Sequence, residues 1–324
     1  MDETAEAIHR GLMMEEDERA SRIASLRRRE RRDDVEAWVS GFLSSAAEER
    51  ADLQPISDDE IHGWLESYVK RYPLCLFLDY DGTLTPIAAH PSKARLRKTM
   101  RDALARCAER KDTDVSIVSG RAMDDIRKMV GDPALIYAAN HGMEVEGPTI
   151  ERFRHPDLVH YEERSQELLQ GLEAIAKDGA WTEAKGPTLT FHVRPVPEAK
   201  RAVLLDRARQ VMADYGYQAR EAHAALEARP PIGWDKGRAV LHILRERYGP
   251  AWSERVRVIY VGDDQTDEDA FRVLAGLAMT VRVGSADTPT AALRRLPNVE
   301  AVRRLLEWIG ARPRADRELL KASR

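Results

Sequence analysis

The chain has 324 residues, of which 43% are apolar and 33% are charged, and its formal net charge is −4. This length favours two domains, and the mixed charges create no whole-chain field that would select nucleic acid or a membrane surface as a partner. No apolar run reaches the roughly 18 residues of a membrane span, and the two cysteines suggest no disulfide framework. We therefore expect a soluble protein of the reducing cytoplasm.

Residues 1–70 are expected to form an N-terminal helical arm and a linker. Within the arm, four apolar residues recur at positions i, i+3, i+4 and i+7, and they are Val35, Trp38, Val39 and Phe42. This spacing places them on one face of a helix. So large an apolar stripe needs a partner surface, either on the rest of this chain or on a second copy.

The first clear strand is predicted at residues 74–78, where five consecutive apolar residues are typical of a strand buried on both faces of a parallel sheet. The run ends at Asp79 and Asp81, whose carboxylates point the same way if the strand continues. Buried carboxylates are costly unless a cation pairs with them. A hard divalent cation with oxygen ligands, usually Mg²⁺ beside a phosphate, would meet that need.

Helices and strands then alternate as they do around a parallel sheet. The strands predicted at residues 115–118, 135–139 and 256–261 end at further polar residues, which are Ser119, Asn140, His141, Asp263, Asp264 and Asp267. Ligands bind at the carboxyl edge of such sheets, so these residues and Asp79 are expected to share one site. The core domain is assigned to residues 71–145 and 231–313, and a polar tail to residues 314–324.

Residues 146–230 change the pattern and are expected to form a separate α+β domain inserted into the core. Helices are predicted near residues 161–176 and 198–215, and residues 217–229 are strand-like. Residues 188–194 alternate strictly between polar and apolar, which indicates an antiparallel strand with one buried face. His192 and Arg194 share its polar face and can reach a common ligand.

The residue types at the sheet edge can support phosphoryl transfer. Asp79 can attack phosphorus and form an aspartyl phosphate, which divides one hard displacement into two easier ones. Asp81 can protonate the leaving alcohol and then deprotonate the attacking water. Ser119 can donate a hydrogen bond to a phosphoryl oxygen, and Lys236 can supply positive charge.

The acidic residues of this edge can also form the cation site. Asp263 would complete an oxygen site for Mg²⁺ with Asp79 and Asp81. Asp264 or Asp267 would orient that shell through hydrogen bonds. The sequence therefore predicts magnesium as the cofactor.

Four segments resemble, in order, the four motifs of the haloacid dehalogenase superfamily of phosphohydrolases, and they are residues 79–83, residues 119–121, Lys236 and residues 262–267. The resemblance implies a Rossmann-like parallel sheet with an inserted α+β cap domain, here preceded by the helical arm. Finer features are similar to the trehalose-6-phosphate phosphatases, and they are residues 140–144, 183–185, 192–194, 226–230 and 262–271. This family resemblance implies an enzyme of trehalose biosynthesis that hydrolyses trehalose 6-phosphate.

The same resemblance implies that both domains hold the sugar phosphate. The expected contacts from the core are Arg121, Asn140 and His141. Those from the cap are Glu183, Lys185, Arg194 and Glu227, with His192 beside them.

Residues 7–43 resemble the final helices of trehalose-6-phosphate synthases. This implies a chain that is descended, or cut, from a fused synthase–phosphatase. The expected partner of the arm is therefore a synthase domain or another copy of the chain, and the arm is expected to lie outside the active site.

Two alternatives stay open at this point. One is the same chemistry on a neighbouring sugar phosphate such as sucrose 6-phosphate, since the cap residues decide selectivity. The other is a non-catalytic regulatory module. Loss of catalysis should remove a key residue, yet Asp79, Asp81, Asp263 and Lys236 are all present.

Overall fold

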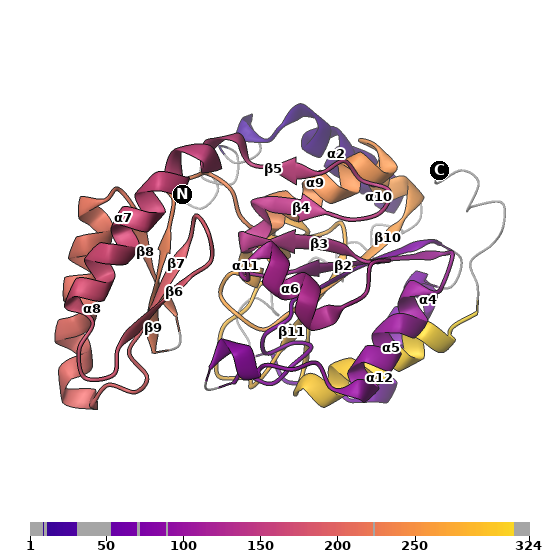
Figure 1. The fold of residues 1–324 in the computed structure, drawn as a ribbon. Helices are drawn as coiled ribbons and strands as arrows, with labels where there is room; N and C mark the ends of the chain where they lie inside the picture. Colours follow the sequence, from indigo (N-terminus) through magenta and orange to yellow (C-terminus); the bar gives the residue numbers. More distant parts are fainter. Residues whose placement is uncertain are drawn as a thin grey trace.

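The computed structural model describes His9 and residues 12–30, 53–69, 72–88, 90–222 and 224–313. These residues form a three-layered α/β core domain with a smaller α+β cap domain beside it (Figure 1). This architecture confirms the α/β class predicted from the sequence. The apolar stripe at residues 35–42 and the polar tail at residues 314–324 lie outside the described residues.

The core sheet has eight strands in the order β12-β11-β10-β1-β2-β3-β4-β5. Their bounds are Leu74–Leu78 (β1), Thr113–Val118 (β2), Ile136–Ala139 (β3), Glu144–Glu146 (β4), Phe153–Arg154 (β5), Arg257–Gly262 (β10), Met279–Val283 (β11) and Arg294–Leu296 (β12). The first six strands in this order run parallel, and β4 and β5 join antiparallel. All five residues of β1 are buried, as expected for a central strand covered on both faces.

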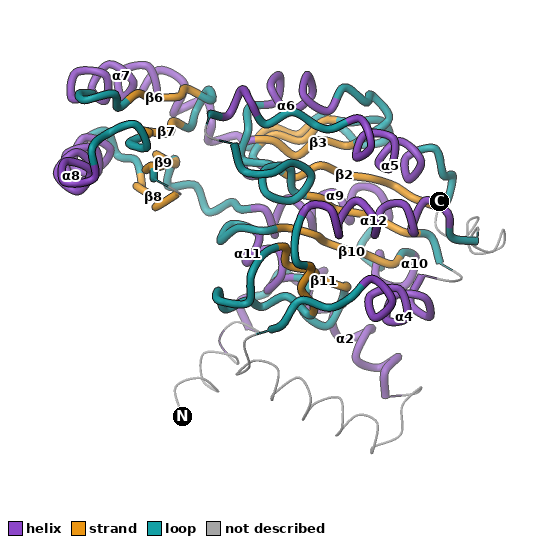
Figure 2. Tube along the Cα trace, turned by 90° about the horizontal axis from the view of Figure 1, so that it is seen from below, coloured by secondary structure: helices purple, strands orange, loops and turns teal. Residues whose placement is uncertain are grey.

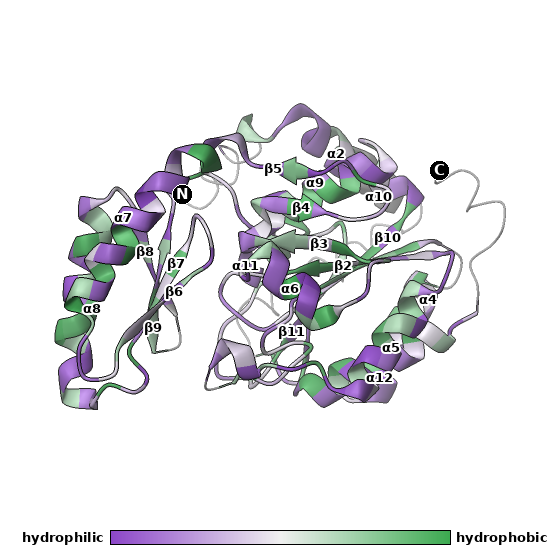
Figure 3. Cartoon of the chain, viewed as in Figure 1, coloured by the Kyte–Doolittle hydropathy of each residue, from purple (hydrophilic) through white to green (hydrophobic). Residues whose placement is uncertain are grey.

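Helices cover both faces of this sheet (Figure 2). One layer contains Asp58–Val69 (α4), Lys98–Ala108 (α5), Met123–Val130 (α6) and Val299–Ala311 (α12). The other contains Lys236–Tyr248 (α9), Trp252–Arg255 (α10) and Asp267–Val273 (α11). Alternate residues of β1 serve the two layers, because Leu76 packs with the first and Phe77 with the second. Apolar residues line the inside of this sandwich (Figure 3).

Of the residues assigned to the N-terminal arm and linker, α4 packs in the core layer given above, whereas the helix Glu16–Glu30 (α2) lies against α10 (Figure 1). The hydroxyls of Ser21 and Ser253 are 3.0 Å apart, and the Arg22 guanidinium donates to the Val273 carbonyl at 2.5 Å. Since α10 leads into β10 and Val273 ends α11, these contacts lie toward the amino-terminal edge of the sheet. In the part of the chain that the structure describes, none of the helices combines the length and apolarity needed to cross a bilayer.

The cap domain is a four-stranded antiparallel sheet backed by two helices. Its strands, in the order β6-β7-β9-β8, are Trp181–Ala184 (β6), Leu189–His192 (β7), Gln218–Ala222 (β8) and Ala225–Arg229 (β9), and its helices are Val159–Ile175 (α7) and Glu198–Asp214 (α8). Leu189 and Phe191 of β7 pack with the two helices. Thr190 and His192 are therefore on the opposite face. Figure 1 shows the helices on the outside and this face of the sheet turned toward the core.

Two features extend beyond the expected pattern. The core sheet continues past residue 145, since β4 turns back along β3 and β5 pairs with β4. Residues 217–229 contribute two paired strands, β8 and β9. In both places the turn back gives an open strand edge a hydrogen-bonding partner. Short 3₁₀ helices occupy Pro91–Lys93 (η1), Asn140–Gly142 (η2) and Pro156–Leu158 (η3).

Candidate active site

The site begins where β1 and β10 end side by side. These parallel neighbours pair Leu78 with Val261, so Asp79 and Asp263 emerge at the same edge. The Asp79 amide donates to the Val261 carbonyl at 2.9 Å, and its side chain is buried. Gly82 has a φ of 86°, and a Cβ there would stand 2.0 Å from the nearer Asp263 oxygen. Only glycine lets this loop approach Asp263 so closely.

Lys236 brings the positive charge to these carboxylates. It is the first residue of α9, whose N-cap is Asp235. Its Nζ donates to Oδ1 of Asp79 and to Oδ1 of Asp267, both at 2.8 Å, and its side chain is 2% exposed. Burial disfavours the ammonium charge, yet the carboxylates around it raise the pKa of Lys236 well above its usual value. Lys236 is therefore a fixed cation.

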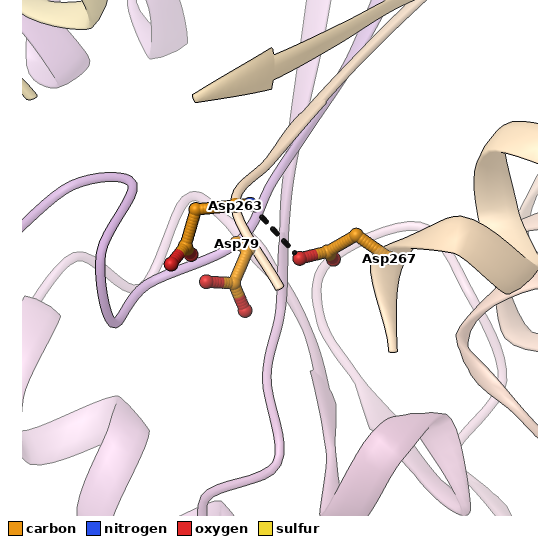
Figure 4. A group of neighbouring side chains, drawn as sticks. All are labelled: Asp79, Asp263 and Asp267. Carbon is orange, nitrogen blue, oxygen red and sulfur yellow. Dashed lines mark hydrogen bonds between the residues drawn. The ribbon is translucent and has the colours of Figure 1, made fainter. Parts of the chain in front are cut away.

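Asp79, Asp263 and Asp267 form an acidic cluster, with one oxygen of each within 4.8 Å of the others (Figure 4). Burial, together with repulsion from neighbouring carboxylates, raises the pKa of Asp263 to about 8 and that of Asp267 to about 6. Three carboxylates this close together repel one another, and a bound cation would relieve that repulsion. An all-oxygen set of this kind fits a hard divalent cation.

The other acidic residues expected at the cation site lie differently. Both oxygens of Asp267 are engaged, since Oδ2 accepts from the amides of Asp263 and Asp264 and Oδ1 also accepts from the Tyr260 hydroxyl. Asp264 accepts from the Thr266 amide and hydroxyl at 2.8 and 2.7 Å. Asp267 and Asp264 therefore shape the loop before α11. Asp79 and Asp263 are left as the carboxylates best able to bind a cation.

Asp81 lies apart from this cluster and faces Arg121. The Arg121 Nε and Nη2 atoms donate to the two Asp81 oxygens at 2.6 and 2.7 Å. Arg121 also donates to Asp125 at 2.7 Å and to the Pro91 carbonyl at 3.0 Å. The Asp81 side chain remains 40% exposed. Arg121, expected to contact substrate, thus orients the Asp81 carboxylate, which itself stays open to the cavity described below.

The ends of β2 and β3 carry three more predicted residues. Ser119 is buried, and its Oγ accepts from the Arg121 amide at 3.3 Å. Asn140 and His141 both have positive φ, 48° and 57°. Asn140 donates to Glu144 and accepts from the Thr188 hydroxyl of the cap at 3.2 Å. The turn after β3 therefore ties the core to the cap.

His141 makes the second tie between the two domains. Its Nε2 lies 2.7 Å from Oε1 of Glu227 on β9, and Arg229 donates to its Nδ1 at 3.1 Å. With Nδ1 as acceptor, Nε2 carries the proton and donates to Glu227. Burial, followed by the Arg229 charge, lowers the pKa of His141 to about 4. His141 is therefore neutral at pH 7.

One cavity of about 840 Å³ joins the acidic cluster to the polar face of the cap sheet. It is lined by all but two of the residues predicted for the site, and these lining residues are Asp79, Asp81, Ser119, Arg121, His141, Glu183, Lys185, His192, Arg194, Glu227, Lys236, Asp263 and Asp264. Asn140 and Asp267 lie behind its wall with the partners given above. The structure thus brings core and cap residues from distant parts of the sequence around one space.

Several residues that hydrogen-bond to the site residues were not predicted from the sequence. Arg229 donates to Glu227 at 2.6 Å, and it could have been recognised because it shares a strand face with Glu227. Thr83 donates to Asp263 at 3.1 Å and lies within the first motif. Tyr260 could not have been identified from the sequence, because a tyrosine in a buried strand does not reveal that its hydroxyl donates to Asp267.

This chain is similar in sequence and in structure to several known proteins. The sequence profile of the family described as trehalose-phosphatase matches residues 77–299. A trehalose 6-phosphate phosphatase of Zea mays is 33% identical over 83% of this chain and 80% of its own length. The trehalose-6-phosphate phosphatase C-terminal domain of C. albicans superposes with a TM-score of 0.69 at 21% identity, covering 82% of this chain and all of that one. A haloacid dehalogenase-like hydrolase from Bacteroides thetaiotaomicron shares the fold, with a TM-score of 0.51 at 18% identity over 74% of this chain and all of that one.

Proposed function

Because this chain belongs to the trehalose-phosphatase family, we propose that it hydrolyses trehalose 6-phosphate to trehalose and phosphate through an aspartyl-phosphate intermediate. The observation that carries the proposal is the shared cavity. Its core wall holds a nucleophilic carboxylate beside a buried lysine, and its cap wall holds polar groups suited to a sugar. Together these walls match the two ends of a sugar phosphate.

In the first step, an Asp79 carboxylate oxygen attacks phosphorus. The bond between phosphorus and the sugar oxygen breaks, and Asp81 protonates that oxygen as it leaves. Lys236, 2.8 Å from Asp79 Oδ1, balances charge on the nucleophile and on the phosphoryl group. Arg121 fixes the direction of the Asp81 side chain, which must carry a proton in this step and takes one up again in the second.

In the second step, Asp81 takes a proton from water, and the water oxygen attacks phosphorus. The bond to Asp79 breaks, and phosphate leaves. Asp79 and Asp263 would hold Mg²⁺, which supplies a Lewis acid for the phosphoryl oxygens when bound. Asp267 would keep Lys236 and the loop at Asp263 in place.

The cap residues would bind the sugar. Glu183, Lys185, His192 and Glu227 reach the cavity from the cap sheet, and Arg194 follows β7 on the same side. Carboxylates accept from sugar hydroxyls, and the cationic side chains donate to them. Ser119 and His141 would complete the wall on the core side.

The test is phosphate release from a panel of sugar phosphates, with Mg²⁺ and with a chelator. We expect trehalose 6-phosphate to give the highest kcat/KM, and we expect chelation to abolish turnover. If sucrose 6-phosphate gave the highest kcat/KM, the proposed mechanism would stand and the proposed substrate would be wrong. No release from any phosphate ester by a folded, Mg²⁺-loaded protein would instead support a regulatory module.

A further inference from the structure

A stack of three aromatic rings joins the cap to the core beside the cavity. The Trp181 indole on β6 lies between the imidazoles of His90 and His192. Ring centroids are 4.7 Å apart on the His90 side and 4.1 Å on the His192 side, with interplanar angles of 10° and 14°. His90 belongs to the core, whereas Trp181 and His192 are paired residues of neighbouring cap strands. One face of the indole thus depends on contact between the domains.

The cap side of the stack leads directly to a proposed sugar ligand. His192 Nε2 lies 3.0 Å from Oε2 of Glu183, which is two residues after Trp181 on the same strand face. Glu183 Oε2 is also 3.8 Å from Lys185 Nζ. The Trp181 ring therefore supports the imidazole that holds the Glu183 carboxylate in its present direction.

The core side of the stack is equally well anchored. His90 lies in the core loop, defined here as residues 86–88 and 90–93. Its Nδ1 is 2.8 Å from the Ser92 hydroxyl and accepts from the Ser92 amide, which fixes the imidazole within the loop. Arg194 donates from the cap to the Ala88 carbonyl at 3.0 Å, and Arg121 donates to the Pro91 carbonyl at 3.0 Å. The loop is thus connected to the cap and to Asp81.

We propose that Trp181 and His90 are positioning residues that couple docking of the cap on the core to the orientation of Glu183 toward the sugar. Contact between His90 and one face of Trp181 holds the indole, the indole holds His192, and His192 holds Glu183. The inference rests on the proposed function, because it concerns how that substrate is bound. It assigns a role to two residues that touch neither the phosphate nor the acidic cluster.

The first test breaks the stack. In Trp181→Leu and in His90→Ala we expect kcat/KM for trehalose 6-phosphate to fall about tenfold, mainly through KM, since an aromatic pair contributes on this scale. Hydrolysis of 4-nitrophenyl phosphate, which has no sugar to be held, should stay within about twofold. His90 is exposed, so its replacement leaves the fold intact even if Trp181→Leu is unstable.

Rescue and coupling separate positioning from simple loss of packing. His90→Phe and Trp181→Phe keep a flat ring, so their KM for trehalose 6-phosphate should lie close to that of the wild type. The double variant His90→Ala/Trp181→Leu should be no worse than the poorer single variant, because both break one chain of contacts. His62→Ala is the matched control. It removes another histidine–tryptophan stack, with Trp308 at 5.0 Å and 7°, from the helix layer of the core, and should lower Tm without changing either substrate's KM.

Three outcomes would overturn the inference. Equal loss on both substrates would make the stack merely structural, unchanged kinetics on trehalose 6-phosphate would remove its role, and additive effects in the double variant would break the proposed chain of contacts. A wild-type protein that cleaves 4-nitrophenyl phosphate but no sugar phosphate would instead defeat the proposed function, and the inference with it.

Discussion

At the scale of single residues, the charges around Lys236 determine the protonation of Asp79, the proposed nucleophile. Burial and repulsion from neighbouring carboxylates raise the pKa of Asp79 well above its usual value, against the opposing charge of Lys236. Asp79→Asn keeps the shape and removes both a charge and the nucleophile. We expect turnover to fall at least about 10³-fold. Thermal stability should be unchanged or higher, because repulsion is relieved.

Phosphate-release assays and calorimetry on Asp79→Asn check both halves of that expectation. Asp114→Asn is a suitable control, since Asp114 pairs with Arg247 and Tyr248 away from the cavity. It should cost stability and leave turnover intact. Substantial turnover in Asp79→Asn would exclude the covalent mechanism.

His141 gives a residue-level prediction of how stability depends on pH. Its pKa of about 4 in the folded protein lies below the ordinary 6.5, so the unfolded chain binds more protons between these values. Stability from neutral His141 is complete above pH 6.5 and is lost as pH falls toward 4. Between pH 7 and pH 5 the loss should be about 2 kcal/mol.

Urea unfolding of wild type and His141→Gln at both pH values isolates this contribution, because the other titrating groups are common to the two proteins. Between pH 7 and pH 5, the free energy of unfolding should fall by about 2 kcal/mol less in His141→Gln than in the wild type. His160→Gln, at an exposed histidine, should behave like wild type. An identical drop in wild type and His141→Gln would show that His141 is not held neutral by burial.

At the scale of elements, β6, β7 and β9 turn one polar face toward the core, and substrate selectivity should depend on that face. Arg194→Ala and Glu183→Ala remove groups from it without touching Asp79 or Lys236. A hydrogen bond to a charged group contributes about 1.5–3 kcal/mol, so kcat/KM for trehalose 6-phosphate should fall about 10- to 100-fold. Hydrolysis of 4-nitrophenyl phosphate should be nearly unchanged.

Steady-state kinetics on both substrates decide this prediction. Lys200→Ala is the control on the outer side of the cap, where Lys200 of α8 pairs with the exposed Asp178. Parallel losses on the sugar phosphate and the aryl phosphate would mean that the cap residues maintain structure and do not select substrate.

The elements also show how far sequence reasoning reached. Apolar runs such as residues 74–78 predicted the central strands, and polar residues after them predicted the sheet edge at which the cavity opens, because both signals are local. The extension of the sheet by β4 and β5 depends on pairing that no local pattern encodes. The same holds for Arg121 on Asp81 and for His90 on Trp181, which meet only after distant segments pack. The pairing partners of site residues were therefore the part that sequence could not supply.

At the scale of the whole molecule, the described part of the N-terminal arm and the cavity lie at different places on the core. Helix α2 contacts α10 and the end of α11 toward the amino-terminal edge of the sheet, whereas the cavity opens at the carboxyl edge. The contact of α2 is polar, through Ser21 and Arg22. Nothing in these contacts reaches a residue of the proposed mechanism.

Deleting residues 1–50 should therefore leave kcat and KM close to wild type. The apolar stripe of Val35, Trp38, Val39 and Phe42 would contribute roughly 6–12 kcal/mol before entropy if fully buried, so its removal should change solubility or oligomeric state. Kinetics, together with light scattering on the full chain and the truncated chain, measure both effects. Ser21→Ala/Arg22→Ala is the milder companion, because it weakens only the contact of α2 with the core. If truncation abolished turnover while circular dichroism showed a folded domain, the arm would have a gating role that its position on the core does not explain.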